Sequence, residues 1–390
     1  MQLRSITPWA LCASACLLRG VLAESTKGAA PEKIAPKVFI VSMFEPEAAV
    51  WWGIREFDLL AHNITVPGAS PLFPDVHCTA DYEICQLVTG EGEINAAVTV
   101  SSIAFSPQFD LTQTYFLLAG IAGISPKAGT LGGVAFSRFA VQVALQHEID
   151  IRELPSNFST SYFPQGGSFP FQYPGSIYGT EVFEVNDELR SIAASLAKNA
   201  TLADAAQAQK YRRLYASNGT VYAAGAAPPA VVECDVATSD VYYSGHLLSG
   251  AFEKTFDVWT NGTGKYCTTA QEDNATLEAL LRAAMHGKTD FARIIVMRTG
   301  SDFDRPPHGV TALQHLVYEW QGGYEPAVAN LYNAGVKVVN GIVNEWDAKF
   351  AAGIKPKNNI GDIFGSLGGK RTHGRRTLQS RSFRGVPEMA

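Results

Sequence analysis

The chain has 390 residues, of which 46% are hydrophobic and 17% are charged, so it is long enough for one large domain or two ordinary ones. This composition excludes an intrinsically disordered chain, and the net charge of −6 disfavours a nucleic-acid partner. The charge is unevenly distributed, because residues 351–390 carry a net charge of +6 and residues 24–350 a net charge of −14. The sequence therefore predicts an acidic folded body followed by a basic tail.

The first 23 residues have the pattern of a signal peptide. Arg4 supplies a positive start, residues 9–18 (WALCASACLL) form an apolar run, and residues 21–23 (VLA) offer small side chains for cleavage. The alternative is a membrane anchor, but the run is shorter than the roughly 20 residues of a spanning helix, and no later window reaches that length. We therefore expect a secreted or cell-surface chain whose mature form has no transmembrane helix.

Sequons and cysteines also indicate export. Six Asn-x-Ser/Thr sequons occur, and each is an acceptor only on the surface of a secreted chain: Asn63, Asn157, Asn199, Asn218, Asn261 and Asn274. Outside the signal peptide, four cysteines remain, which allow two disulfides in three connectivities. We favour Cys78–Cys85 with Cys234–Cys267, the alternative being four unpaired core residues. Paired CxxC spacing is absent, so no metal site is predicted.

After a polar linker over residues 24–36, apolar runs and helical patterns alternate. Buried strands are predicted by their β-branched and apolar residues, and helices by capping signals and periodicity. The strands expected are residues 37–43, 84–88, 114–118, 132–136, 141–145, 230–236 and 291–297. The helices expected are a first turn at 44–47 and residues 91–104, 186–215, 310–320 and 326–343, the last interrupted at Gly335. This alternation is typical of an α/β domain with a mixed, largely parallel central sheet flanked by helices.

Three segments are predicted to be irregular. A small-residue loop is expected at residues 119–123 (AGIAG), directly after a strand. Residues 155–180 are rich in Pro, Gly, Ser and aromatics, and a long loop of this kind is usually functional or disordered. The tail at residues 351–390 lacks periodicity and is expected to be disordered.

Three acidic residues lie where α/β sheets commonly bind ligands, beyond the carboxyl ends of strands. Glu47 follows the first strand, Glu272 begins a helix, and Asp302 follows the last strand. Each also has a structural explanation. Thr269 and Glu272 have the spacing of a capping box, Glu47 complements a helix dipole, and Asp302 can cap a turn.

The order of several motifs resembles the nucleoside phosphorylase and nucleosidase superfamily, and most closely the fungal purine nucleoside permease family. The superfamily resemblance is carried by residues 37–47, 89–97 (TGEGEINAA), 119–123 and 129–134 (GTLGGV). The permease resemblance is carried by residues 43–47 (MFEPE), 173–181 (YPGSIYGTE) and 239–245 (SDVYYSG). Together they cover about residues 37–350 and imply a single nucleoside-phosphorylase-like domain.

The resemblance implies roles for individual residues. Glu272 matches the acid that binds the ribose hydroxyls, and Asp302 matches the acid that protonates the purine at N7 and so improves the leaving group. Glu47 matches the acid that positions or activates the attacking water. Tyr242 matches an aromatic residue that covers the base, with Tyr243 beside it, although both tyrosines could equally be packing residues. Gly120 and Ile121 lie in the matching central segment.

The sequence departs from the superfamily pattern at two positions, one expected to contact phosphate and one expected to contact the ribose. Ile121 stands where relatives carry a small hydroxyl residue, and an apolar side chain cannot donate a hydrogen bond to phosphate. Only proximity in the sequence suggests Arg138, Arg298 or Arg305 as phosphate ligands, so phosphorolysis is disfavoured. Gln271 stands where nucleosidases carry a methionine under the ribose, which changes the expected shape of the sugar pocket.

Other chemistries have weaker support. The pair Gly90-x-Gly92 does not extend to a dinucleotide fingerprint, the histidines lack ligand spacing, and no serine nucleophile elbow occurs. We therefore predict no cofactor. The basic tail could bind a cell-wall or anionic membrane partner, but a solvated tail is the simpler interpretation.

Two functions from different classes remain open. One is an exported purine-nucleoside-binding protein that supports nucleoside uptake, as the family name implies, although a transporter has to cross the bilayer by helices or a closed barrel. The other is a secreted nucleosidase that cleaves the N-glycosidic bond of purine nucleosides. A storage or structural protein on the same fold is a third, less specific alternative. Relatives on this fold often assemble symmetrically, which leaves a homo-oligomer open.

Overall fold

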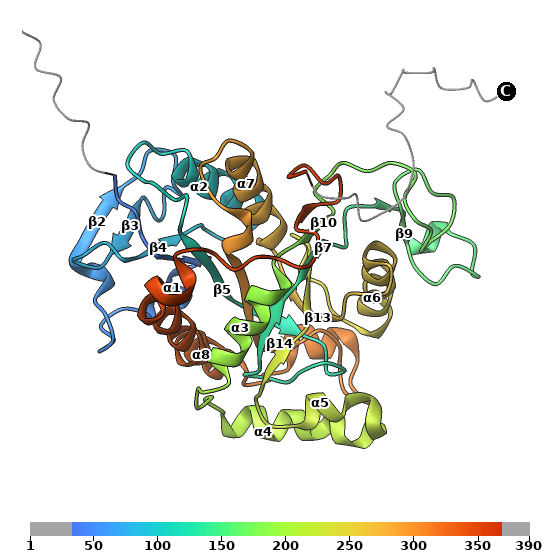
Figure 1. Cartoon of the computed structure of the whole chain (residues 1–390). Coiled ribbons are helices and arrows are strands. Elements are labelled where there is room, and N and C mark those ends of the chain that lie inside the picture. The colour runs from blue at the N-terminus through green and yellow to red at the C-terminus, as the bar shows by residue number, and fades with distance from the viewer. Residues whose placement is uncertain (1–32, 369–390) are drawn as a thin grey trace, which may run out of the picture. The chain divides into compact units, whose positions relative to one another are not determined.

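The computed structural model describes residues 33–368 (Figure 1). The predicted signal peptide, residues 24–32 of the linker, and residues 369–390 of the predicted tail lie outside the described residues. Within 33–368, eight α-helices are formed: α1 Glu45–Ala49, α2 Glu93–Ala104, α3 Asp187–Ala197, α4 Ala206–Arg212, α5 Ala223–Ala226, α6 His246–Thr260, α7 Asp273–Met285 and α8 Tyr324–Asn344. No helix in this range is long and apolar enough to span a bilayer.

Fifteen strands occur in the same range, thirteen of them in one large sheet. They are β1 Val38–Ser42, β2 His62–Thr65, β3 Asp75–Cys78, β4 Ile84–Val88, β5 Tyr115–Ile124, β6 Val134–Ser137, β7 Phe139–Gln142, β8 His147–Glu148, β9 Tyr162–Phe163, β10 Val182–Glu184, β11 Val231–Glu233, β12 Asp235–Thr238, β13 Tyr266–Ala270, β14 Ile294–Phe303 and β15 Gly361–Asp362. The main path of the large sheet runs β15-β10-β7-β12-β13-β5-β1-β4-β3-β2, with β14 beside β5 and β6, and β11 beside β6.

The predicted α/β class and mixed sheet are confirmed. Parallel pairing joins β1 to β4 and β5, β14 to β5, and β12 to β7 and β13. Antiparallel pairing joins β13 to β5 and β14 to β6, and it also forms both ends of the sheet. The sheet is thus more evenly mixed than the description "largely parallel" suggests.

Alternating side chains of the central strands build two cores, one on each face of the sheet. Phe39 and Val41 of β1 pack with α2 and α7, whereas Val38 and Ile40 pack with α3 and α8. Figure 1 shows these helix pairs around the central strands. Because β1 and β5 are buried on both faces, they are apolar without alternation, which is why the sequence predicted β1 and the first half of β5.

Several predicted boundaries were wrong for identifiable reasons. The expected loop at residues 119–123 is the second half of β5, and the strand expected to end at residue 297 continues as β14 to Phe303. The helix expected at 310–320 is reduced to a π-helical turn, Gln314–Tyr318. The helical stretch at 186–215 is divided into α3 and α4, whereas α8 runs through Gly335 without interruption.

The folded chain also extends beyond the predicted start of the tail at residue 351. Strand β15 pairs antiparallel with β10 and completes the edge of the large sheet. Asn358 donates hydrogen bonds to Glu184 and to the carbonyl of Val185, which fix the segment before this strand. These contacts are non-local, so residue composition near 351–368 could not indicate them.

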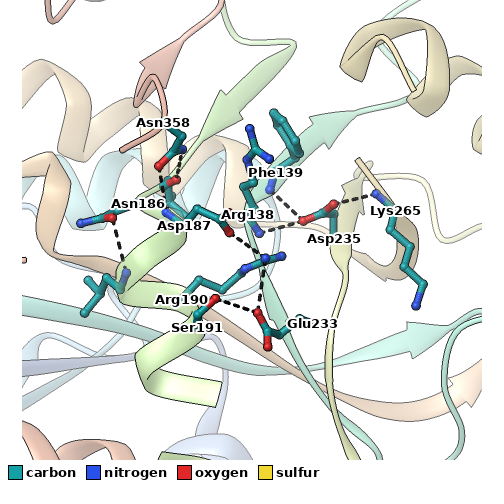
Figure 2. Close-up of polar contacts among 12 residues, drawn as sticks. Arg138, Phe139, Asn186, Asp187, Arg190, Ser191, Glu233, Asp235, Lys265 and Asn358 are labelled. Atoms are coloured by element: carbon teal, nitrogen blue, oxygen red, sulfur yellow. Dashed lines mark hydrogen bonds and ion pairs between the residues drawn. The ribbon is translucent and has the colours of Figure 1, made fainter. Parts of the chain in front are cut away.

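The buried carboxylate of Asp235 connects the strands next to α3 through hydrogen bonds (Figure 2). The Asp235 side chain accepts hydrogen bonds from the backbone N–H groups of Arg138, Phe139 and Lys265, at 2.7, 3.0 and 2.7 Å. Beside it, the Glu233 carboxylate forms an ion pair with Arg190 and accepts a hydrogen bond from the Ser191 hydroxyl, and both partners belong to α3. Burial raises the pKa of Asp235 above its ordinary value, against these three hydrogen bonds. This carboxylate therefore holds backbone in place.

Both predicted disulfides are formed. Cys78–Cys85 links the neighbouring strands β3 and β4, and Cys234–Cys267 links the start of β12 to β13. All four cysteine side chains are buried.

Candidate functional site

One cavity of about 360 Å³ lies beside the ends of β1, β12 and β13 and the second halves of β5 and β14. Its volume is within the range of small-molecule sites. The lining includes six of the seven predicted site residues, which come from segments far apart in the sequence: Glu47, Ile121, Tyr242, Tyr243, Glu272 and Asp302. The seventh, Gly120, lies directly behind the lining. The structure thus brings the whole predicted set together.

Glu47 is buried at the first turn of α1, just after β1. Its two carboxylate oxygens accept hydrogen bonds from the backbone N–H groups of Met43 and Ile121, each at 2.7 Å. Burial raises the pKa of Glu47 to about 8, although Arg298 and the two N–H donors oppose this shift. Glu47 can therefore exchange a proton near neutral pH, which a helix-capping role would not require.

The small residues of β5 make room for these buried charges. A Cβ atom at Gly120 would clash with the Arg298 guanidinium and would lie 2.8 Å from the Met43 sulfur and 3.0 Å from a Glu47 oxygen. The next residue, Ile121, binds both charged groups through its backbone: its N–H donates to Glu47, and its carbonyl accepts from Arg298 at 3.1 Å. The run of small residues therefore reflects close approach of side chains to a strand.

Glu272 lies at the N-cap position of α7 but makes no capping hydrogen bond, so the predicted capping box with Thr269 is wrong. Its side chain points to the cavity. One oxygen accepts from the backbone N–H of Gly92 at 3.0 Å, and the other accepts from Arg298 at 3.2 Å. Each oxygen retains a second lone pair, so the carboxylate can still accept hydrogen bonds from ligand hydroxyls.

Asp302 lies within β14, next to a register shift between Gly300 and Asp302. Such a bulge allows consecutive side chains to face the same side, and both Ser301 and Asp302 line the cavity. Burial raises the pKa of Asp302 above its ordinary value, against hydrogen bonds from Tyr242 and Ser301 that lower it. The Ser301 hydroxyl donates to Asp302 at 2.8 Å. The site therefore favours a protonated Asp302 more than water does.

The two tyrosines differ in their surroundings. Tyr242 is 58% exposed, and its ring covers the cavity near Asp302. Tyr243 is 5% exposed and packs edge-on against Phe252, with its hydroxyl 3.2 Å from that of Tyr266. Tyr242 therefore forms a partly exposed edge of the cavity whose hydroxyl donates to Asp302, whereas Tyr243 is a packed part of its wall.

The arginines proposed as phosphate ligands are all paired. Arg298 contacts Asp273 at 2.9 Å and Glu272 at 3.2 Å. The other two lie outside the cavity lining, where Arg138 pairs with Glu184 and Arg305 pairs with Asp304 and Glu253. The Arg298 charge is therefore already balanced by two carboxylates.

Acidic groups dominate the cavity. Among the described residues, its lining contains one basic side chain, Arg298, and four acidic ones: Glu47, Glu91, Glu272 and Asp302. In the same part of the chain, no group of three or more His, Cys, Asp or Glu side chains could hold a metal ion. The cavity is thus suited to a neutral ligand, or to one that develops positive charge.

Sequence reasoning missed several contributors to the site. Met43, Ser301 and Tyr324 line the cavity, and Asp273 anchors Arg298 from below it. The sequence suggested Arg298 only as a phosphate ligand, whereas in the structure it forms ion pairs with the carboxylates of Glu272 and Asp273. A signal was present in the sequence, because Arg298 precedes Asp302 by four residues in one apolar strand, where a buried charge requires partners.

Solved structures similar to this chain at low sequence identity include a nucleosidase and a hydrolase. A 5′-methylthioadenosine/S-adenosylhomocysteine nucleosidase from Neisseria meningitidis is 15% identical, covers 79% of this chain and 99% of its own, and has a TM-score of 0.46. Futalosine hydrolase from Helicobacter pylori is 13% identical, covers 80% of this chain and 98% of its own, and has a TM-score of 0.44.

Sequence relatives are much closer. A purine nucleoside permease from Candida albicans is 45% identical over 351 residues, which are 88% of this chain and 84% of that protein. A probable purine nucleoside permease from Schizosaccharomyces pombe is 43% identical over 319 residues, 80% of this chain and 90% of that protein. The family model of purine nucleoside permease (NUP) matches residues 35–355. The chain therefore belongs to the purine nucleoside permease family.

Proposed function

We propose that the cavity binds purine nucleosides and that the chain hydrolyses their N-glycosidic bond, releasing free base and ribose without phosphate. The observation that carries this proposal is the charge of the cavity. The cavity lining holds four carboxyl groups and a single arginine, which is already paired with Glu272 and Asp273. Such a site offers phosphate no unpaired cation, and its ionised carboxylates stabilise the positive charge that develops on ribose as the glycosidic bond breaks.

Each acidic residue has a role that its surroundings support. Glu272 accepts hydrogen bonds from the ribose hydroxyls with its free lone pairs. Asp302, whose pKa is raised by burial, gives its proton to a purine ring nitrogen, and the C–N bond electrons leave with the base. Glu47, in the fraction of molecules in which it is ionised, takes a proton from water, and the water oxygen bonds to the anomeric carbon; this fraction grows as pH approaches 8. The proton on Glu47 then replaces the one that Asp302 lost, by way of solvent.

A second candidate is binding without cleavage, as an exported component of nucleoside uptake. Membership in the permease family and the names of the Candida and Schizosaccharomyces relatives favour this role. Both candidates include export, which the first 23 residues, the sequons and the two disulfides support.

Incubation of the full chain with adenosine, inosine and guanosine, with and without phosphate, separates the candidates. We expect free base and ribose in phosphate-free buffer, detected by chromatography. Base released only with phosphate, together with ribose 1-phosphate, would contradict hydrolysis. Saturable binding by calorimetry without any base would favour the uptake component, and absence of both binding and cleavage would exclude a nucleoside site.

The Asp302→Asn variant tests the acid. Because an amide cannot give up a proton to the base, kcat is expected to fall by about 10²–10⁴-fold, with the nucleoside Kd changed by less than about tenfold. Glu188→Gln on α3, which also removes one carboxylate but lies outside the cavity, is the control and should keep wild-type kcat. An unchanged kcat in Asp302→Asn would show that another group protonates the base.

A further inference from the structure

A second, smaller cavity adjoins the first across Asp302. Its volume is about 160 Å³, roughly ten times the space that one buried water requires. It shares four lining residues with the larger cavity: Tyr242, Ser301, Asp302 and Tyr324. The hydrogen bond from Tyr242 to Asp302 lies in this shared wall. We call the smaller cavity the annex, defined by the shared wall together with Ser244, Phe303 and residues 315–316 and 319–323.

The shared wall is partly exposed. Tyr242 is 58% exposed, so displacing its ring toward solvent costs its hydrogen bond to Asp302 but leaves no hole in the core. The outer side of the annex is formed by the segment with the π-helical turn Gln314–Tyr318, where Leu316 and Trp320 are 46% and 67% exposed. Single π-helical turns often occur at functional sites, and this one carries apolar side chains at the rim.

The annex has an apolar side that an uncharged group can contact, and Glu319 and Gln321 also line it. Phe303, Leu316 and Trp320 supply apolar surface. His315 is buried with both ring nitrogens engaged, by the Tyr211 hydroxyl at 2.7 Å and the Phe303 carbonyl at 2.8 Å, and burial lowers its pKa, so it remains neutral. Within residues 33–368, the buried Ser244 hydroxyl has no hydrogen-bond partner, and a ligand atom can satisfy it.

We propose that the annex accepts a substituent at the 6-position of a purine nucleoside, so that the chain takes 6-substituted purine nucleosides as well as unsubstituted ones. This inference rests on the proposed function, in which Asp302 contacts the purine at N7. N7 and the exocyclic group at position 6 lie side by side on one edge of a purine. A base held by Asp302 therefore directs its 6-substituent to the wall that separates the two cavities.

The test compares adenosine, N6-benzyladenosine and 2-benzylaminoadenosine, which carries the same group on the far side of the ring, by calorimetry and by base release. We expect N6-benzyladenosine to bind within about tenfold of adenosine, and the 2-substituted isomer to bind at least tenfold more weakly than the N6 isomer. Leu316→Trp fills the annex from its exposed rim. It is expected to lower the preference for N6-benzyladenosine relative to adenosine by at least tenfold, whereas Leu316→Ala should preserve it.

Leu247→Trp, at an 83% exposed position outside both cavities, is the matched control and should leave the ratio unchanged. Adenosine binding combined with more than 100-fold rejection of N6-benzyladenosine would overturn the annex and leave the proposed function intact. A ratio unaffected by Leu316→Trp would also overturn it. If neither nucleoside binds, the proposed function fails and this inference fails with it.

Discussion

At the residue scale, the main feature of the site is that the surroundings of Glu47 shift its pKa in opposite directions. Burial favours its neutral form, while Arg298 and two backbone N–H donors favour the ionised form. Burial has the larger effect, so the pKa is raised to about 8 from an ordinary 4.5. A base with a pKa near neutrality can take a proton from water and release it again, which neither a fully exposed nor a fully paired glutamate does as well.

This shift has a consequence for stability. Folded Glu47 keeps its proton up to about pH 8, whereas unfolded Glu47 loses it near pH 4.5, so the unfolded state binds fewer protons in this window. Rising pH therefore destabilises the fold through this group, by about 1.4 kcal/mol per pH unit between these two pKa values. Glu47→Gln removes the titration, but its amide nitrogen cannot accept one of the two backbone N–H bonds, which costs about 1–3 kcal/mol.

We therefore expect the wild-type chain to be more stable than Glu47→Gln at pH 5 and to lose this advantage as pH rises to 8. Urea denaturation of both proteins at pH 5, 6, 7 and 8 measures the difference. The exposed substitution Glu345→Gln should give curves parallel to those of the wild type. A constant gap between the wild type and Glu47→Gln would contradict the raised pKa.

At the element scale, glycines decide how closely elements approach. Gly335 in α8 faces Trp51, and a Cβ atom there would lie 2.5 Å from the indole ring and 3.1 Å from the Met297 side chain. The sequence suggested a helix interruption at this glycine, but α8 is continuous, and the glycine allows close packing against Met297 of β14 and against Trp51, which follows α1. Gly250 in α6 differs, since a Cβ atom there would meet nothing within 4 Å.

The two helical glycines should therefore respond to alanine with opposite signs. Gly335→Ala is expected to destabilise the fold by about 1–3 kcal/mol, because the buried Trp51 ring has to move. Gly250→Ala is expected to stabilise it by about 0.5–1 kcal/mol through helix propensity alone. Thermal and urea unfolding of the two variants measure both effects. Stabilisation by Gly335→Ala would show that α8 lies farther from Trp51 than described.

At the scale of the whole molecule, the sequons separate into accessible and inaccessible sites. Asn63, Asn157, Asn199 and Asn261 are exposed. Asn274 is 2% exposed, its amide nitrogen donates to the Thr180 carbonyl at 2.7 Å, and its oxygen accepts from Thr238 at 2.6 Å. The sequence pattern does not distinguish these sequons, whereas the fold buries Asn274 and so makes it inaccessible to glycosylation.

Folded protein recovered from the medium of a eukaryotic host should carry glycans at the four exposed asparagines and none at Asn274. A glycan on the Asn274 nitrogen has no room at this buried position and would displace the amide nitrogen from the Thr180 carbonyl. Glycosidase treatment in heavy-oxygen water followed by peptide mass spectrometry locates the sites. Full absence of glycans on this protein would contradict the accessibility of the four exposed sequons, while a glycan on Asn274 in folded protein would contradict its burial.

The sequence by itself determined the elements whose signals are local. β1, β4, α2 and the first half of β5 follow from uninterrupted apolar runs and helix-entry glycines, and the candidate acids followed from their order in the chain. Both disulfides were favoured among three connectivities on spacing alone. Residues 119–123 were expected to form a loop and the last strand was expected to end at residue 297, because small and charged residues in strands are unusual unless buried partners exist.

Those partners are contributed by distant segments, and only the tertiary structure placed them. Glu47, Glu272 and Asp273 converge on Arg298 from two helix starts, and this convergence requires Gly120 to lack a side chain. The π-helical turn, the β14 bulge and β15 likewise depend on contacts between residues far apart in sequence. Local propensity indicates only which secondary structure a segment favours by itself. Burial of charge decides the chemistry of this cavity, and it depends on the assembled fold.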